Sequence, residues 1–106
     1  MGGRTAAEVL ALPVRLNGIQ LGRPLEALLQ PHSDRILGFE VLCGDGAQRF
    51  LPYAVVRIER GEIALDSALT LIDETDADYY RQRGRRLSEL GYRCPWIDDR
   101  GDVHNG

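Results

Sequence analysis

The chain of 106 residues contains no lysine, and all 13 of its basic side chains are arginines. We interpret this absence first as a compositional bias of the genome, and second as selection for forked donors that bind carboxylate or phosphate. The basic residues are outnumbered by 16 acidic ones, which gives a net charge of −3. This charge argues against a generic polyanion-binding domain, because such domains usually carry a basic excess. A local basic patch remains compatible with it.

Long apolar runs are also absent. No stretch approaches the roughly 18–20 apolar residues of a membrane span. The segment Met1–Val14 has one arginine and a broken apolar patch, so we expect no signal peptide. The two cysteines, Cys43 and Cys94, are too few for a disulfide scaffold, and we expect Cys43 to act as a small buried apolar side chain. We therefore expect a cytoplasmic, reduced protein without membrane contact.

No set of side chains resembles a catalytic constellation. A nucleophile needs a base within hydrogen-bond reach, and the only pair that a hairpin could bring together is His32 with Cys43. Cys43, however, is expected to point inward, while His104 and Cys94 lie in a tail without pattern. No His or Cys pair has the spacing of a metal site. Gly44-Asp45-Gly46 lies between strands, so it predicts a turn and not a phosphate loop. We expect no enzyme activity, no cofactor and no metal.

Between Leu21 and Asp73 the chain consists of short apolar segments separated by turn signals. The central strand is expected at Arg35–Cys43, where alternate residues form two faces. The first face holds Leu37, Phe39, Val41 and Cys43, and the second holds Ile36, Gly38, Glu40 and Leu42. Because one face is wholly apolar and the other is mixed, we predict a strand that is packed on one side only.

Other strands flank this one. Asn17-Gly18 predicts a tight hairpin turn before a strand at Ile19–Gln30. Pro24 interrupts that strand and cannot donate to a ladder, so we expect an edge strand or a bulge there. Further strands are expected at Gln48–Leu51, at Val55–Ile58 and at Ile63–Leu65, with Ala68–Ile72 closing the sheet. Short strands at this spacing predict a small β-barrel.

The pattern changes to a helical one after Asp73. Ala77, Tyr80, Gly84, Leu87 and Leu90 fall on one stripe of a helix expected at Thr75–Leu90. Thr75 and Asp78 resemble a capping box, and Gly91 is a suitable stop. The expected fold is all-β, a small barrel followed by one C-terminal helix. Its segments are a flexible N-terminus (1–12), the barrel (13–73), the helix (74–91) and a disordered tail (92–106).

The order of short motifs in the barrel segment matches a known pattern. The motifs are Asn17-Gly18, Leu21–Leu29, Asp34–Phe39, Arg49–Pro52, Val56–Ile58 and Ile63–Leu65. In this order and spacing they resemble the PRC-barrel family, which includes the cytoplasmic domain of the photosynthetic reaction-centre H subunit and the C-terminal domain of the ribosome maturation factor RimM. The resemblance covers a little over half of the chain and implies a binding or adaptor module that acts through protein contacts. Two departures are Pro24, where the family usually has a β-former, and Glu26, where it often has Asp.

An arginine-rich stretch within the expected helix is the main candidate for an interaction surface. The candidate residues are Tyr79, Tyr80, Arg81, Arg83, Arg85, Arg86, Leu87 and Leu90. Three interpretations remain open: a solvated helix face with internal pairs such as Asp78 with Arg81, a protein interface, or an RNA contact through phosphate charge and base stacking.

These patterns favour a non-catalytic protein-interaction or adaptor module of the PRC-barrel type that forms a homodimer. A dimer contact would cover the expected edge at the Pro24 strand and bury the Tyr and Leu candidates. The alternative is an RNA- or ribosome-associated accessory factor that uses the arginine-rich helix.

Overall fold

A computed structural model of the chain describes residues 3–106; Met1 and Gly2, the start of the expected flexible N-terminus, lie outside the described residues. The strands are β1 (Arg4–Thr5), β2 (Val14–Leu16), β3 (Ile19–Leu29), β4 (Ile36–Cys43), β5 (Gln48–Pro52), β6 (Arg57–Ile58), β7 (Ile63–Leu65), β8 (Arg85–Arg86), β9 (Trp96–Ile97) and β10 (Val103–His104). The helices are α1 (Ala6–Leu10) and α2 (Glu74–Arg83), with the 3-10 turns η1 (Tyr53–Val55), η2 (Ala68–Thr70) and η3 (Leu87–Glu89). The fold is predominantly β, as expected.

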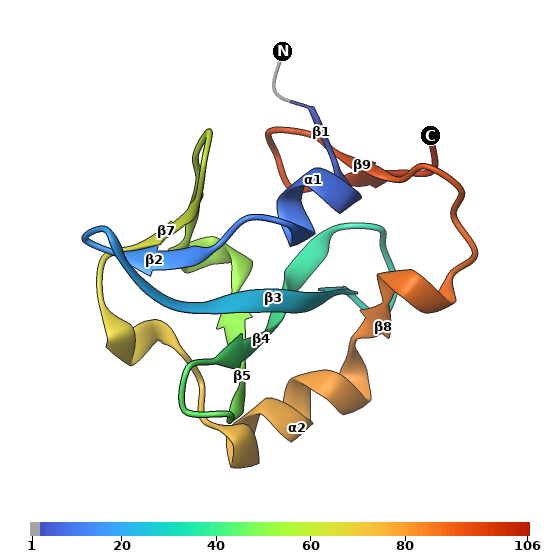
Figure 1. The fold of residues 1–106 in the computed structure, drawn as a ribbon. Coiled ribbons are helices and arrows are strands. Elements are labelled where there is room, and N and C mark those ends of the chain that lie inside the picture. Colours follow the sequence, from blue (N-terminus) through green and yellow to red (C-terminus); the bar gives the residue numbers. More distant parts are fainter. Residues whose placement is uncertain (1–2) are drawn as a thin grey trace.

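One sheet forms the centre of the molecule. Its strand order is β5-β4-β3-β2-β7-β6, and β8 pairs with β3 beyond the end of β2. All pairs are antiparallel except β2 with β7. A smaller sheet of β1, β9 and β10 lies with α1 on one side of β3, while α2 lies on the other side (Figure 1).

Local turn signals predict the hairpins correctly. Asn17 and Gly18 both have positive φ, 50° and 80°, which is the backbone that a two-residue hairpin turn requires. The turn after β4 closes with the amide of Gly46 donating to the carbonyl of Cys43 at 2.9 Å. The strands expected around residues 19–30 and 35–43 are therefore confirmed as β3 and β4.

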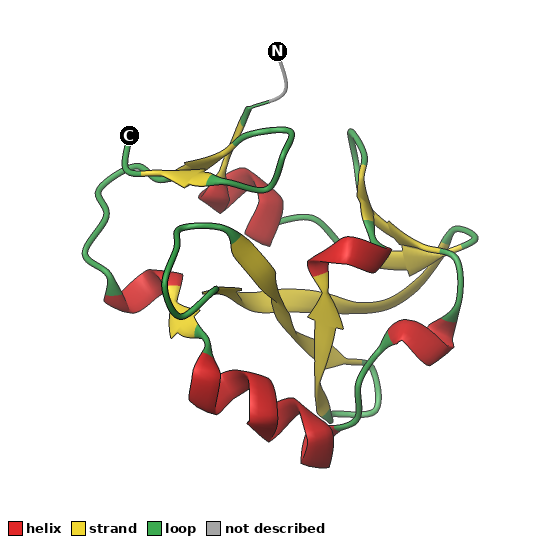
Figure 2. Ribbon diagram, turned by 180° about the vertical axis from the view of Figure 1, so that it is seen from behind, coloured by secondary structure: helices red, strands yellow, loops and turns green. Residues whose placement is uncertain are grey.

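The sheet is not closed into a barrel, which corrects the expected fold. Closure would need pairing between β5 and β6, the two ends of the strand order, and β6 has only two residues. The segment expected to close the sheet, 68–72, begins instead with the 3-10 turn η2. Its link to the sheet is a single bridge between Phe50 and Ile72. Within residues 3–106 the sheet thus remains open (Figure 2).

Strand β4 is buried on both faces, so the prediction of one-sided packing was wrong. Phe39 and Val41 face a core that also includes Val9 of α1 and Ile97 of β9. The opposite face of the sheet packs against α2 through a second cluster of Leu28, Phe50 and Ala77, with Leu37, Ile72 and Tyr80 beside it. Leu37 is on this second face, because a register shift near Leu28 and Leu29 changes the alternation at the start of β4.

Strand β3 is an interior strand and not an edge. Pro24 is buried and pairs with Val41 on β4, and a register shift follows it, as expected of a bulge. On the other side of β3, pairing with β2 ends at Gly22 and pairing with β8 begins at Leu28. Among the described residues, no strand therefore pairs with Pro24 on the side away from β4, which is where a residue without an amide donor is tolerated.

Helix α2 ends at Arg83, well before the expected end at Leu90. Gly84 has extended backbone (φ −77°, ψ 156°) and lies so close to β3 that an added Cβ would be 3.0 Å from the Cβ of Leu28. After this contact the chain forms β8 and then η3. The N-cap is Asp73, without a side-chain capping bond, so the capping box expected from Thr75 was also wrong.

Both ends of the described chain are built into the small sheet, in place of the flexible N-terminus and disordered tail that the sequence suggested. Thr5 forms a capping box with Glu8 at the start of α1, and β1 pairs with β9. Ile97 and Val103, from the expected tail, are 3% and 4% exposed. Neither helix of residues 3–106 is long and apolar enough to cross a membrane.

Candidate functional site

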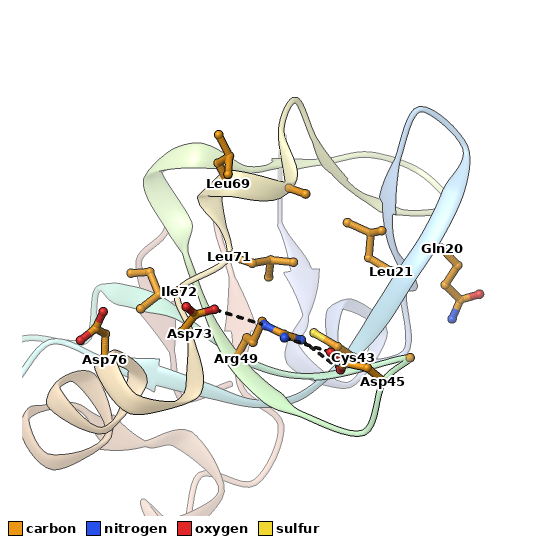
Figure 3. A pocket seen from close by; sticks show the side chains of 12 residues that line it. Gln20, Leu21, Cys43, Asp45, Arg49, Leu69, Leu71, Ile72, Asp73 and Asp76 are labelled. Atoms are coloured by element: carbon orange, nitrogen blue, oxygen red, sulfur yellow. Dashed lines mark hydrogen bonds and ion pairs between the residues drawn. The ribbon is translucent and has the colours of Figure 1, made fainter.

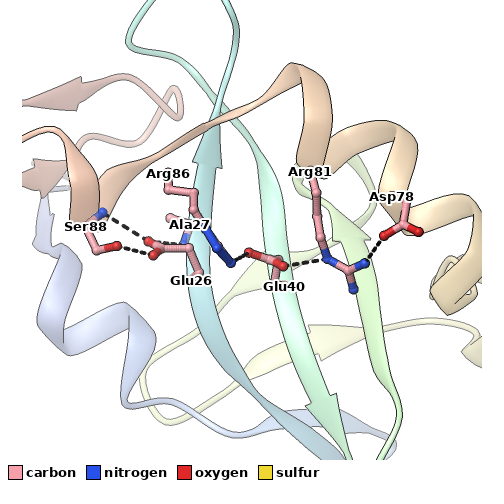
Figure 4. Close-up of polar contacts among 7 residues, drawn as sticks. All are labelled: Glu26, Ala27, Glu40, Asp78, Arg81, Arg86 and Ser88. Carbon is pink, nitrogen blue, oxygen red and sulfur yellow. Dashed lines mark hydrogen bonds and ion pairs between the residues drawn. The ribbon is translucent and has the colours of Figure 1, made fainter.

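The arginine-rich stretch does not form a free basic face. Arg81 donates through Nε to Glu40 at 2.7 Å, and Arg86 donates to the other carboxylate oxygen at 2.6 Å (Figure 4). Arg81 also pairs with Asp78 on its own helix. The side chain of Glu40 is 2% exposed, so both guanidinium groups point into the protein to reach it.

A second buried glutamate lies next to the first. Glu26 of β3 is directly opposite Glu40 of β4, in a register where like charges repel each other. The backbone amides of Ala27 and Ser88 donate to Glu26 at 3.2 Å each, and the Ser88 hydroxyl donates to its other oxygen. These contacts, with those of Glu40, fasten α2, β8 and η3 to the sheet. They are a structural polar network, not an open site.

Arg85 is also engaged. It donates to the carboxylate of Asp34 at 2.7 Å and to the backbone carbonyls of Gln30 and Ser33. The hydroxyl of Tyr92 donates to the same carboxylate at 2.5 Å. The hydrogen bond from Tyr92 first, and that from Arg85 second, hold the pKa of Asp34 below its ordinary value.

Of the remaining candidates, only two face outward. Leu87 is 5% exposed, Leu90 packs against the core, and Tyr80 stacks on Phe50 with ring centroids 4.3 Å apart. Tyr79 is 55% exposed, and the guanidinium of Arg83 covers its ring at 3.7 Å. The structure thus places most of the predicted interaction residues in packing and ion pairs.

The one candidate nucleophile–base pair is not formed. His32 lies in the turn before β4, whereas Cys43 ends this eight-residue strand, which spans about 23 Å. Among the side chains that the structure describes, no three of His, Cys, Asp or Glu converge as metal ligands.

An open groove lies on the surface of the described part of the chain. Its volume is about 680 Å³, and it lies between the start of β3, the turn after β4 and the loop 66–73, here called the η2 loop. Figure 3 shows Leu21 and Leu71 facing its interior and Leu69 at its rim. The lining residues are Gln20, Leu21, Cys43, Gly44, Asp45, Arg49, Ala68, Leu69, Leu71, Ile72, Asp73 and Asp76.

The η2 loop is fixed at both ends and in its middle. Asp66 pairs with Arg57 at 2.6 Å at the start, and Ile72 exchanges two backbone hydrogen bonds with Phe50 at the end. Between them, the hydroxyl oxygen of Ser67 accepts from the amide of Leu69 at 3.1 Å. The side chain of Leu69 is nevertheless 94% exposed. An ordered turn therefore holds a leucine out into solvent beside the groove.

Arg49 organises the charges at the bottom of the groove. It forms two parallel hydrogen bonds with Asp45, at 2.9 and 3.0 Å, and its Nε lies 3.7 Å from Asp73. The hydrogen bonds from Arg49 lower the pKa of Asp45 to about 2. The charge of Arg49 is thus already balanced inside the site.

A second hollow of about 560 Å³ lies between α1, η1 and the loop after β9. Tyr53 and Asp98 line it. The carboxylate of Asp98 already bonds to His104 at 2.9 Å and to the amides of Arg100 and Asp102. This hollow therefore offers fewer unengaged groups than the groove.

The groove was missed because residues 68–72 were interpreted as a strand. Ser67, two positions before Leu69, is the available signal, since a serine hydroxyl often closes such a turn. No family model matches the chain, and neither does any curated protein.

Proposed function

We propose that this chain is a cytoplasmic, non-catalytic protein-interaction module that resembles the PRC-barrel family in the order of its motifs but has an open sheet. We propose that it docks a partner protein in the groove beside the η2 loop. The single observation that carries this proposal is the exposure of Leu69, 94%, on a turn held in place by Ser67 and by the bridge to Phe50. An ordered, exposed leucine beside a groove with an apolar interior fits an interface core, where large apolar side chains enter hollows of the partner.

The alternative of an RNA-associated factor has weaker support. Phosphate binding needs arginines that are free to contact phosphate groups and so displace the counterions condensed on the nucleic acid. Arg81, Arg85 and Arg86 already pair with Glu40 or Asp34. Only Arg83 of this cluster points outward without a carboxylate partner among the described residues.

Affinity capture from a lysate of the source organism, with and without nuclease, separates the two functions. The protein-interaction module predicts that the same protein partners are recovered in both samples. Loss of every partner on nuclease treatment would favour the RNA alternative, and recovery of the bait alone would contradict the proposed function.

Self-association stays a prediction. Its expected contact surface has changed, because β3 is an interior strand and Leu87 and Leu90 pack inside the chain. Leu25, 43% exposed, and Tyr79 are apolar groups that remain for a dimer contact. Light scattering at high micromolar concentration should give twice the 11.8 kDa of one chain, and a monomeric mass would exclude the dimer.

A further inference from the structure

The groove has an acidic end. Asp73 and Asp76 lie where the η2 loop enters α2, and Arg49 is the single basic residue of the lining. Because Asp45 holds Arg49 by two hydrogen bonds, its charge is balanced before Asp73 and Asp76 are counted. The described residues of the lining therefore carry two negative charges in excess.

Neither aspartate has a strong partner. The side chain of Asp73 is 82% exposed, makes no capping hydrogen bond with α2, and is 3.7 Å from the occupied Arg49. Asp76 is exposed in the first turn of α2. Acidic residues at a helix N-terminus stabilise the helix by interacting with its dipole. The interaction with the helix dipole does not account for the groove or for the exposed Leu69 beside Asp73 and Asp76.

Apolar groups lie directly beside these charges. Leu21 and Leu71 are partly buried against the core at the interior of the groove, and Ile72 adjoins the acidic end (Figure 3). Leu69 forms the outer rim. A ligand that fits the whole groove must therefore present a cation next to apolar side chains.

We propose that the groove binds a protein segment in which an arginine or lysine is flanked by apolar residues. The cation lies against Asp73 and Asp76, and the flanking side chains contact Leu69, Leu71 and Leu21. Charge complementarity selects this occupant, because an acidic segment would be repelled and a neutral one would gain no electrostatic attraction from the two carboxylates. This inference rests on the proposed function and names the chemistry of the partner.

Selection from a phage-displayed library of random peptides tests it, with the full chain as the immobilised target. Selected peptides should carry Arg or Lys next to apolar residues. They should bind an Asp73→Asn, Asp76→Asn double variant about tenfold more weakly, because two exposed ion pairs are lost. Asparagine is a good residue at the N-cap, the position of Asp73, and Asp76 is an exposed residue of the first turn, so we expect the double variant to keep α2. Circular dichroism of the double variant checks this. The matched control is Glu89→Gln with Asp99→Asn, which changes the net charge equally at exposed positions outside the groove.

Three results would overturn the inference: selected peptides without basic residues, equal affinity for the Asp73→Asn, Asp76→Asn variant, or no peptide enriched by the wild-type chain. The affinity of the wild-type chain should also fall with added salt, which is a readout that needs no variant. Failure of this test with partners still captured from the lysate would reject the basic ligand and leave the interaction module in place. Failure of the capture alone would reject the module.

Discussion

Glu40 is a charged side chain inside the protein, and its surroundings explain why it is tolerated there. A buried carboxylate is costly unless it is paired and hydrogen-bonded. Arg81 and Arg86 supply the opposite charge and the hydrogen bonds, and each arginine donates to one carboxylate oxygen of Glu40. The same two bonds hold α2 and β8 on the sheet, so the polar network positions the end of the η2 loop as well.

We expect Glu40→Gln to lower the free energy of unfolding by about 2 kcal/mol, because two charge-assisted hydrogen bonds are weakened at a buried position. Urea unfolding, followed by the fluorescence of Trp96, measures this loss. The control is Glu62→Gln, whose pair with Arg15 is 3.6 Å long and partly exposed, and which should cost less than about 0.5 kcal/mol. Equal effects of the two substitutions would contradict the structural role of Glu40.

Asp45 makes stability depend on pH in the acidic range. Its pKa is about 2 in the folded chain, against an ordinary value of 3.8, since Arg49 favours the carboxylate. A lowered folded-state pKa stabilises the fold above the unfolded value, and this contribution is lost as the pH falls through the folded one. The stability difference between wild type and Asp45→Asn should therefore be constant near neutral pH and shrink from pH 3.8 to pH 2.

Urea unfolding at a series of pH values, followed by circular dichroism, measures this difference. Arg49→Gln should reduce the pH dependence in the same way, because it removes the cause of the shifted pKa. Parallel curves for wild type and Asp45→Asn across the acidic range would contradict the ion pair.

At the level of elements, local signals predicted local structure. The Asn17-Gly18 turn follows from residue type, and strands β3 and β4 follow from the alternation of apolar residues. Gly84 was placed on the stripe of the expected helix, whereas its close contact with Leu28, far away in the sequence, lies where the helix ends. Leu69 could not be identified as exposed, because an exposed and a buried leucine have the same local pattern.

The tail, residues 92–106, also could not be predicted from local patterns, because its structure depends on distant residues. Its strands have two residues each, too few for a pattern, and β9 pairs with β1 from the other end of the chain as well as with β10. Glu40 was likewise assigned to the mixed face of its strand, and Glu26 was noted only as a departure from the family pattern. Their burial is explained by α2, β8 and η3, which supply partners from distant positions.

A substitution at Ile97 tests whether the tail belongs to the fold. Ile97 is 3% exposed, so Ile97→Ala should lower the free energy of unfolding by about 3 kcal/mol through lost burial and a cavity. Ile19→Ala is the matched control, because the same change at a 67% exposed side chain should stay within about 0.5 kcal/mol. Urea denaturation measures both, and an unchanged stability of Ile97→Ala would mean that the tail is not docked.

For the whole molecule, the open sheet is what makes the groove. A closed barrel would have placed residues 68–72 in a strand, with alternate side chains buried. Because the sheet stays open, these residues form a turn that is joined to β5 only at Ile72 among the described pairings, and Leu69 is left beside the groove. The departure from the expected fold and the candidate site are thus the same structural feature.

The central claim is that partner proteins bind at the η2 loop, and quantitative capture by surface variants tests it most directly. Wild type, Leu69→Ser and Ile19→Ser should be immobilised in equal amounts and exposed to nuclease-treated lysate. Both substitutions remove an exposed apolar side chain, but only Leu69 borders the groove. We predict that partners bound by wild type and by Ile19→Ser are lost from Leu69→Ser. Recovery of the same partners by Leu69→Ser would contradict the account.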